Sequence, residues 1–120
     1  MKKDNIIKDK SYAFALRVIK AYKFLTSEQK EFVLSKQMLR SGTAIGALVR
    51  ESEYAQSTPD FISKLSIALK EANRTEYWIL LLKDSEHISE ASFDSIHTDC
   101  VELIKLLTSI INTSKKTINN

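Results

Sequence analysis

Residues 37–82 read QMLRSGTAIGALVRESEYAQSTPDFISKLSIALKEANRTEYWILLL, and this stretch decides the fold. Two runs with the periodicity of an α-helix, about 100° per residue, meet across one short turn at residues 56–59. Thr58 can cap the second run, Pro59 suits the first helical position, and Asp60 places negative charge in the first turn. The stretch therefore predicts two antiparallel helices.

The rest of the chain extends this pattern into a bundle. The chain has 120 residues with only two glycines and one proline, which favours helix over sheet in a single domain. Apolar spacing predicts helices at about residues 10–26, 36–56, 59–85 and 89–114. Short polar turns between them predict an all-α, up-down-up-down antiparallel four-helix bundle that occupies residues 1–120.

The helix expected at 36–56 is apolar on two sides, and a helix of that kind usually packs against two neighbours. Gly42 and Gly46 lie one turn apart on one of these sides. Because glycine destabilises a helix by about 1 kcal/mol relative to alanine, the pair predicts close approach by a neighbouring subunit; simple tolerance of glycine is the alternative. Arg74 and Trp78 are residue types enriched in interfaces. We expect these four residues to form an oligomer contact.

Charged residues also fall on stripes that should face the core. Glu76 lies in the apolar stripe of the helix expected at 59–85. An unpaired buried charge is strongly unfavourable, so we predict that Glu76 pairs with Arg40 on the facing helix, with Glu51 or Glu71 completing the network. The alternative is that Glu76 reaches solvent at the edge of the bundle.

Basic charge is concentrated near the N-terminus. Residues 1–30 hold eight Lys or Arg and three acidic residues, whereas the other 90 residues hold ten basic and twelve acidic ones. Lys10, Arg17, Lys20 and Lys23 share one arc of the first helix. This arc is either a solvated face or a surface that contacts nucleic-acid phosphates.

Reaction chemistry is not indicated. The chain has no phosphate-binding glycine loop, no cysteine pair and no nucleophile elbow. Its two histidines follow aspartates, but one lies in a turn and the pairs do not fit a di-metal bundle site. Cys100 lies among apolar residues and reads as a small core residue. We expect no enzyme activity, no cofactor and no metal. The sequence has no signal peptide or apolar run long enough for a bilayer, so we expect a cytoplasmic protein.

The strings QMLRSGTAIGALVRES and DFISKLSIALKEANRTEYWILLL closely resemble a family of four-helix-bundle proteins. That family is named after proteins encoded in intervening sequences of bacterial 23S ribosomal RNA. It is related to the accessory variability determinant proteins of diversity-generating retroelements. The resemblance implies a homopentameric ring and, from the retroelement relatives, binding to nucleic acid. We therefore expect RNA or DNA binding through the first helix; a protein-interaction scaffold without nucleic-acid binding is the alternative.

Overall fold

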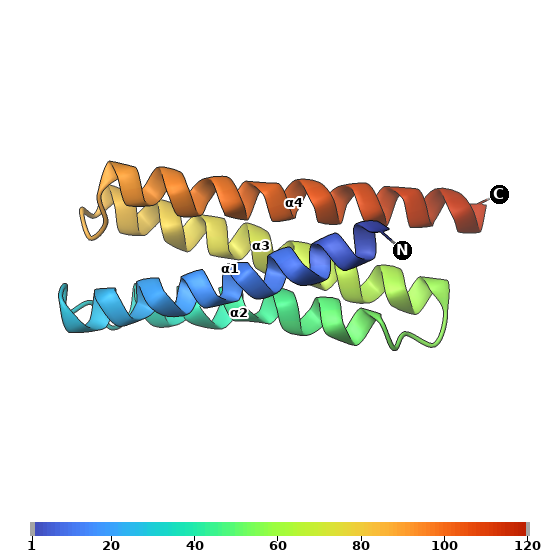
Figure 1. Ribbon diagram of the computed structural model, residues 1–120, viewed down its shortest axis with the longest axis horizontal. Coiled ribbons are helices and arrows are strands. Elements are labelled where there is room, and N and C mark those ends of the chain that lie inside the picture. The colour runs from blue at the N-terminus through green and yellow to red at the C-terminus, as the bar shows by residue number, and fades with distance from the viewer. Residues whose placement is uncertain (1, 120) are drawn as a thin grey trace.

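Four long helices form the chain in the computed structural model, which describes the backbone of residues 2–119 and the side chains of residues 6–118. The helices are α1 (Lys2–Ser27), α2 (Leu34–Ser52), α3 (Thr58–Asp84) and α4 (Glu90–Asn119). They run alternately up and down, and both termini lie toward the same end of the bundle (Figure 1). Each helix packs against the next one along the chain, and α1 closes the bundle against α4. The predicted four-helix architecture is confirmed.

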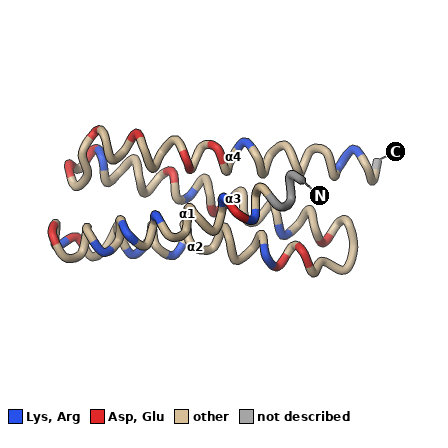
Figure 2. The backbone as a smooth tube through the Cα atoms, viewed as in Figure 1, with Lys and Arg blue, Asp and Glu red and all other residues tan. Residues whose placement is uncertain are grey.

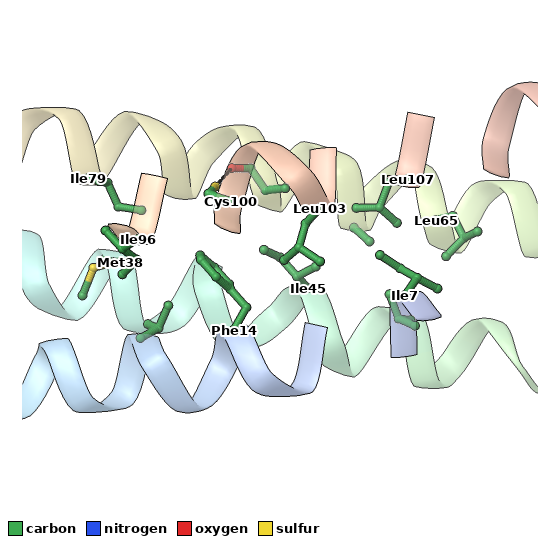
Figure 3. Packing of buried hydrophobic residues seen from close by; sticks show 14 of the residues in the cluster. Ile7, Phe14, Met38, Ile45, Leu65, Ile79, Ile96, Cys100, Leu103 and Leu107 are labelled. Atoms are coloured by element: carbon green, nitrogen blue, oxygen red, sulfur yellow. Dashed lines mark hydrogen bonds between the residues drawn. The ribbon is translucent and has the colours of Figure 1, made fainter. Parts of the chain in front are cut away.

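The core lies on the common axis of the bundle. One apolar stripe from each helix enters it, so that Ile7 and Phe14 from α1, Ile45 from α2 and Leu103 from α4 are at most 2% exposed (Figure 3). A buried hydrogen bond of 2.8 Å between the hydroxyls of Ser41 and Thr75 links α2 to α3. No helix within the described residues is long and apolar enough to cross a membrane.

The outer helices are longer than predicted. α1 begins at Lys2 rather than near residue 10, and α4 continues to Asn119 rather than ending near 114. Ile7 explains the first difference, because it lies one turn before Ser11 and extends the buried stripe toward the N-terminus. Residues 2–9 hold only two apolar residues, Ile6 and Ile7, which was too few for apolar spacing to predict this part of the helix.

One helix cap differs from the prediction, and the cap of α2 is supplied from the preceding loop. The side chain of Ser57, not Thr58, caps α3 by accepting a hydrogen bond from the Asp60 N–H at 3.2 Å. At the start of α2, Ser35 is buried and the Glu31 carboxylate serves the free N–H groups. It accepts from the backbone of Leu34 at 2.9 Å, of Ser35 at 2.7 Å and of Val33 at 3.1 Å. Burial raises the pKa of Glu31, but these hydrogen bonds outweigh it and leave the pKa below its ordinary value.

Both glycines of α2 face α1 of the same chain. A Cβ atom on Gly42 would lie 2.8 Å from Val18 Cγ2, and one on Gly46 would lie 3.4 Å from the Ser11 carbonyl oxygen. The prediction that they admit a neighbouring subunit is therefore wrong. The apolar side that carries them, with Met38, Ile45 and Val49, is the core side of α2 and is already buried.

Candidate nucleic-acid interface

The basic arc of α1 divides into two pairs. Lys10 forms an ion pair with Glu102 at 3.1 Å, and Arg17 forms one with Asp99 at 2.6 Å, so both are directed to α4. Arg17 also donates to the Ser95 carbonyl oxygen at 3.4 Å. Lys20 and Lys23 are exposed and have no acidic partner among the described residues. The four predicted phosphate ligands are therefore not equivalent, and only the second pair is free to bind an anion.

The free cations of α1 continue onto α2. Residues 10–27 contain four basic residues and no acidic one, and residues 32–50 contain three basic residues and no acidic one. Figure 2 shows Lys and Arg gathered on the parts of α1 and α2 near the loop that joins them. We call this the α1–α2 basic surface. The cations near this loop that lack an acidic partner among the described residues are Lys20, on the side of α1 next to α4, Lys23, Lys36, and Arg40, on the side of α2 next to α3. Arg50 also lacks an acidic partner there but lies in the last turn of α2, at the other end of the helix.

An exposed aromatic ring lies beside Arg50, toward the other end of the same two helices. Tyr12 is 56% exposed, and the Arg50 guanidinium carbon lies 5.8 Å from the centroid of its ring. Such a pair offers a flat surface on which a base can stack. Sequence analysis limited the basic region to the first 30 residues and so missed the part on α2. The missing signal was the absence of Asp and Glu from residues 32–50, beyond a loop that contains Glu28 and Glu31.

Negative charge is concentrated at the end of α3, in the following loop and in the first half of α4. Residues 84–102 contain six acidic residues and no Lys or Arg. Two of these acids, Asp99 and Glu102, hold Arg17 and Lys10. Repulsion from this segment disfavours an anionic partner on α4, so the α1–α2 basic surface is the side on which a polyanion would bind.

The predicted network around Glu76 does not form. Glu76 Oε2 lies 2.8 Å from His97 Nε2, and Arg40 is exposed on another side of the bundle. Its pairing with Arg40 was therefore wrongly predicted, because Glu76 faces α4 rather than α2. Glu51 lies 3.8 Å from Lys64, and Glu71 lies 3.1 Å from Arg74. The charges form separate pairs, each partly open to solvent.

Arg40, Glu71 and Arg74 nevertheless come together in one groove. This α2–α3 groove has a volume of about 470 Å³ and is lined by Gln37, Arg40, Ser41, Ala44, Glu71 and Arg74. Glu71 is the least exposed of its charged side chains at 20%, compared with 55% for Arg74. Arg40 lines the groove and also belongs to the α1–α2 basic surface, so the two features adjoin.

Trp78, predicted as an interface anchor, is half-buried on α3. Its ring makes an edge contact with Tyr77 at a centroid distance of 5.1 Å. Its indole N–H is buried and has no hydrogen-bond partner among the described residues. Whether Trp78 contacts a second subunit stays a prediction.

Groups suited to covalent chemistry are few. Cys100 is fully buried, its thiol lies 3.4 Å from the Ala72 carbonyl oxygen (Figure 3), and burial together with the charge of Glu76 raises its pKa to about 12. That agrees with a core residue and not with a nucleophile. Among the described residues, no group of three His, Cys, Asp or Glu could hold a metal ion.

These features define a class of protein: a small four-helix bundle whose distinctive chemistry is the charge on its surface. Residues 3–109 match the family of 23S rRNA-intervening sequence proteins, and the chain belongs to that family. A crystal structure at 1.70 Å of a protein of unknown function from the S23 ribosomal protein family of Bacteroides thetaiotaomicron VPI-5482 is similar to it. The two chains are 61% identical with a TM-score of 0.91, over 92% of this chain and 98% of the other. Comparison with curated proteins finds no match.

Proposed function

We propose that the protein is a non-enzymatic nucleic-acid-binding protein that acts through the α1–α2 basic surface. The observation that carries this proposal is the absence of acidic residues on α1 from Lys10 to its end and on α2 as far as Arg50; the loop between the two helices holds Glu28 and Glu31. Four cations on that surface, Lys20, Lys23, Lys36 and Arg40, have no acidic partner among the described residues. Phosphates on a nucleic acid would supply the missing negative charge and release counterions on binding.

The arrangement favours the nucleic-acid backbone as the main ligand. The Lys and Arg positions form a band along two packed, antiparallel helices, as Figure 2 shows for the backbone. A band of this kind suits a charged polymer and carries no base specificity of its own. The alternative is a scaffold that binds only protein, and it predicts no dependence of binding on these cations.

We also propose that the protein assembles into a closed ring of five subunits, the number being that of the family it resembles. Supporting this, α3 exposes three large apolar side chains outside the core: Ile67 at 41%, Tyr77 at 55% and Leu80 at 36%. A closed ring would remove such residues from water in every subunit. Trp78 borders them, whereas Arg74 pairs with Glu71 in the α2–α3 groove and is left out of the proposed contact. A cytoplasmic location fits both proposals.

Charge reversal tests the binding surface. The variant Lys23→Glu/Lys36→Glu changes two exposed cations, and Lys105→Glu/Lys115→Glu applies the same change of charge to exposed residues of α4. We expect the first variant to lose binding to structured RNA and duplex DNA at low salt, and the second to retain most of it. All four side chains are exposed, so the melting temperature should change little. Equal loss in both variants would contradict the proposed surface.

Light scattering tests the assembly separately. Five chains of 13.7 kDa would give a particle of about 68 kDa. The variant Leu80→Asp places a charge in the proposed contact and should yield smaller species. A parent protein that stays at 13.7 kDa at tens of micromolar would refute self-assembly, and a dimer or tetramer would refute only the number five.

A further inference from the structure

The α2–α3 groove differs from the α1–α2 basic surface because it contains a carboxylate. The carboxylate of Glu71 would repel a phosphate, so its presence argues against a groove that binds phosphate alone. Glu71 Oε2 is 3.1 Å from Arg74 Nη1, and its other oxygen, Oε1, has no hydrogen-bond partner among the described residues. The groove therefore offers a partly buried acceptor beside two guanidinium groups, Arg74 and Arg40.

The wall of the groove on α2 is both polar and well supported. Ser41 is 3% exposed, and its hydroxyl is bonded to Thr75 at 2.8 Å and to the Gln37 carbonyl oxygen at 3.1 Å. The side-chain amide of Gln37 makes no hydrogen bond among the described residues, so it can both donate to and accept from a ligand. A backbone held in place by hydrogen bonds, next to polar groups that have no partner within the chain, is suited to hydrogen bonding with the edge of a planar ligand.

Resting on the proposed nucleic-acid binding, we infer that this groove is a base-recognition subsite that prefers an unpaired guanine. Arg40 adjoins the α1–α2 basic surface and would hold the phosphate of the nucleotide. Glu71 would accept the two adjacent donors on the Watson–Crick edge of guanine, N1–H and the N2 amino group. Arg74, fixed against the same carboxylate, would donate to O6. Volumes of several hundred Å³, such as the 470 Å³ here, are typical of small-ligand sites.

The chemistry separates guanine from the other bases. Adenine presents an acceptor at N1, which would face the carboxylate unfavourably. Uracil presents one donor, N3–H, between two acceptors, and cytosine presents one donor, the N4 amino group, next to two acceptors, so neither offers two adjacent donors. An unstacked base in a loop or single strand exposes its whole edge, so the subsite would act on single-stranded segments and not within a duplex.

Fluorescence anisotropy with four labelled single-stranded RNAs tests the inference. The RNAs are uracil tracts with G, A, C or U at one central position. We expect the RNA with guanine to bind about tenfold more tightly than the others, the discrimination typical of one good bidentate contact. Glu71→Gln should remove this difference, because the amide replaces one of the two acceptor oxygens with a donor, which cannot pair with the second donor of guanine. Arg40→Gln should weaken all four RNAs by a similar factor.

Glu102→Gln is the matched control, because Glu102 also pairs with a basic residue, Lys10, but lies on α4 outside the groove. It should leave the guanine preference intact. Equal affinity of the parent protein for all four RNAs, or a preference that persists in folded Glu71→Gln, would overturn this inference alone. Absence of binding to these RNAs and also to structured RNA and duplex DNA would overturn the proposed function as well. If Glu71→Gln fails to fold, competition on the parent protein decides: GMP should displace the RNA at lower concentration than AMP, and equal displacement would overturn the subsite.

Discussion

Alanine in place of Gly42 tests the close contact between α1 and α2. The new Cβ atom would lie 2.8 Å from Val18 Cγ2 and 3.0 Å from Val18 Cγ1. Val18 is fully buried and β-branched, so its side chain cannot rotate away without leaving its preferred rotamer. The two helices must separate slightly, which loosens the packing along their shared length.

Two opposing effects set the magnitude. Alanine is favoured over glycine within a helix by about 1 kcal/mol. An extra methyl group in a packed core is unfavourable by about 1–3 kcal/mol. The clash should exceed the helix preference, so we expect Gly42→Ala to lower the free energy of unfolding by about 1 kcal/mol. Gly46→Ala meets only an ordinary contact of 3.4 Å with the Ser11 carbonyl oxygen, so the helix preference should prevail and stabilise the protein.

Urea unfolding followed by circular dichroism gives both values at one fixed protein concentration. The variant Val18→Ala supplies the missing space, and in a double-mutant cycle it should reduce the effect of Gly42→Ala by at least about 0.5 kcal/mol. A Gly42→Ala protein as stable as the parent would refute the predicted clash. If the substitution instead lowered the molar mass without affecting the stability of the subunit, Gly42 would belong to a subunit contact after all.

Three further changes follow from individual contacts. Glu31→Ala removes the carboxylate that caps α2 and should lower stability at neutral pH by about 1 kcal/mol. Because the pKa of Glu31 is lowered in the folded chain, the stabilisation by this carboxylate should be lost as pH falls below 4.5. The melting temperatures of variant and parent should therefore converge at low pH. Cys100, with its pKa raised to about 12, should resist a thiol reagent at pH 8 in the native protein and react at once in denaturant; rapid native reaction would contradict its burial. Glu76→Ala should cost about 1 kcal/mol or less by thermal melting, since the side chains of Glu76 and His97 are 30% and 28% exposed, and a loss of several kcal/mol would mean that the pair is more critical than its exposure indicates.

Local rules predicted most of the fold. Apolar spacing, the Ser-Thr-Pro-Asp turn and the scarcity of glycine were sufficient for four helices in alternating directions. The termini were harder, because Lys2 to Asp9 carry few apolar residues and the helix there depends on Ile7 packing into the core. That contact exists only after the helices assemble, so the sequence pattern alone placed the start of the helix too late, near residue 10 rather than at Lys2.

Relations between helices were predicted less well. Periodicity shows which residues share a face, but not which helix covers it. Gly42 and Gly46 therefore correctly indicated a close helix contact, but the partner was α1 and not another subunit. Likewise, Glu76 was correctly recognised as needing a partner, but the sequence did not show that His97, on α4, lies within 2.8 Å of it. A list of positive charges also could not show that Arg17 is neutralised by Asp99, 82 positions further along the chain.

The salt dependence of nucleic-acid binding tests the central claim most directly. For duplex DNA, each phosphate contact contributes about −0.9 to the slope of log Kobs against log[salt]. Lys23→Glu/Lys36→Glu removes two contacts from the α1–α2 basic surface and should reduce the size of the slope by about 1.8 per engaged subunit, while Lys105→Glu/Lys115→Glu should leave it unchanged. A parent slope near zero, or the same reduction in both variants, would contradict binding through this surface.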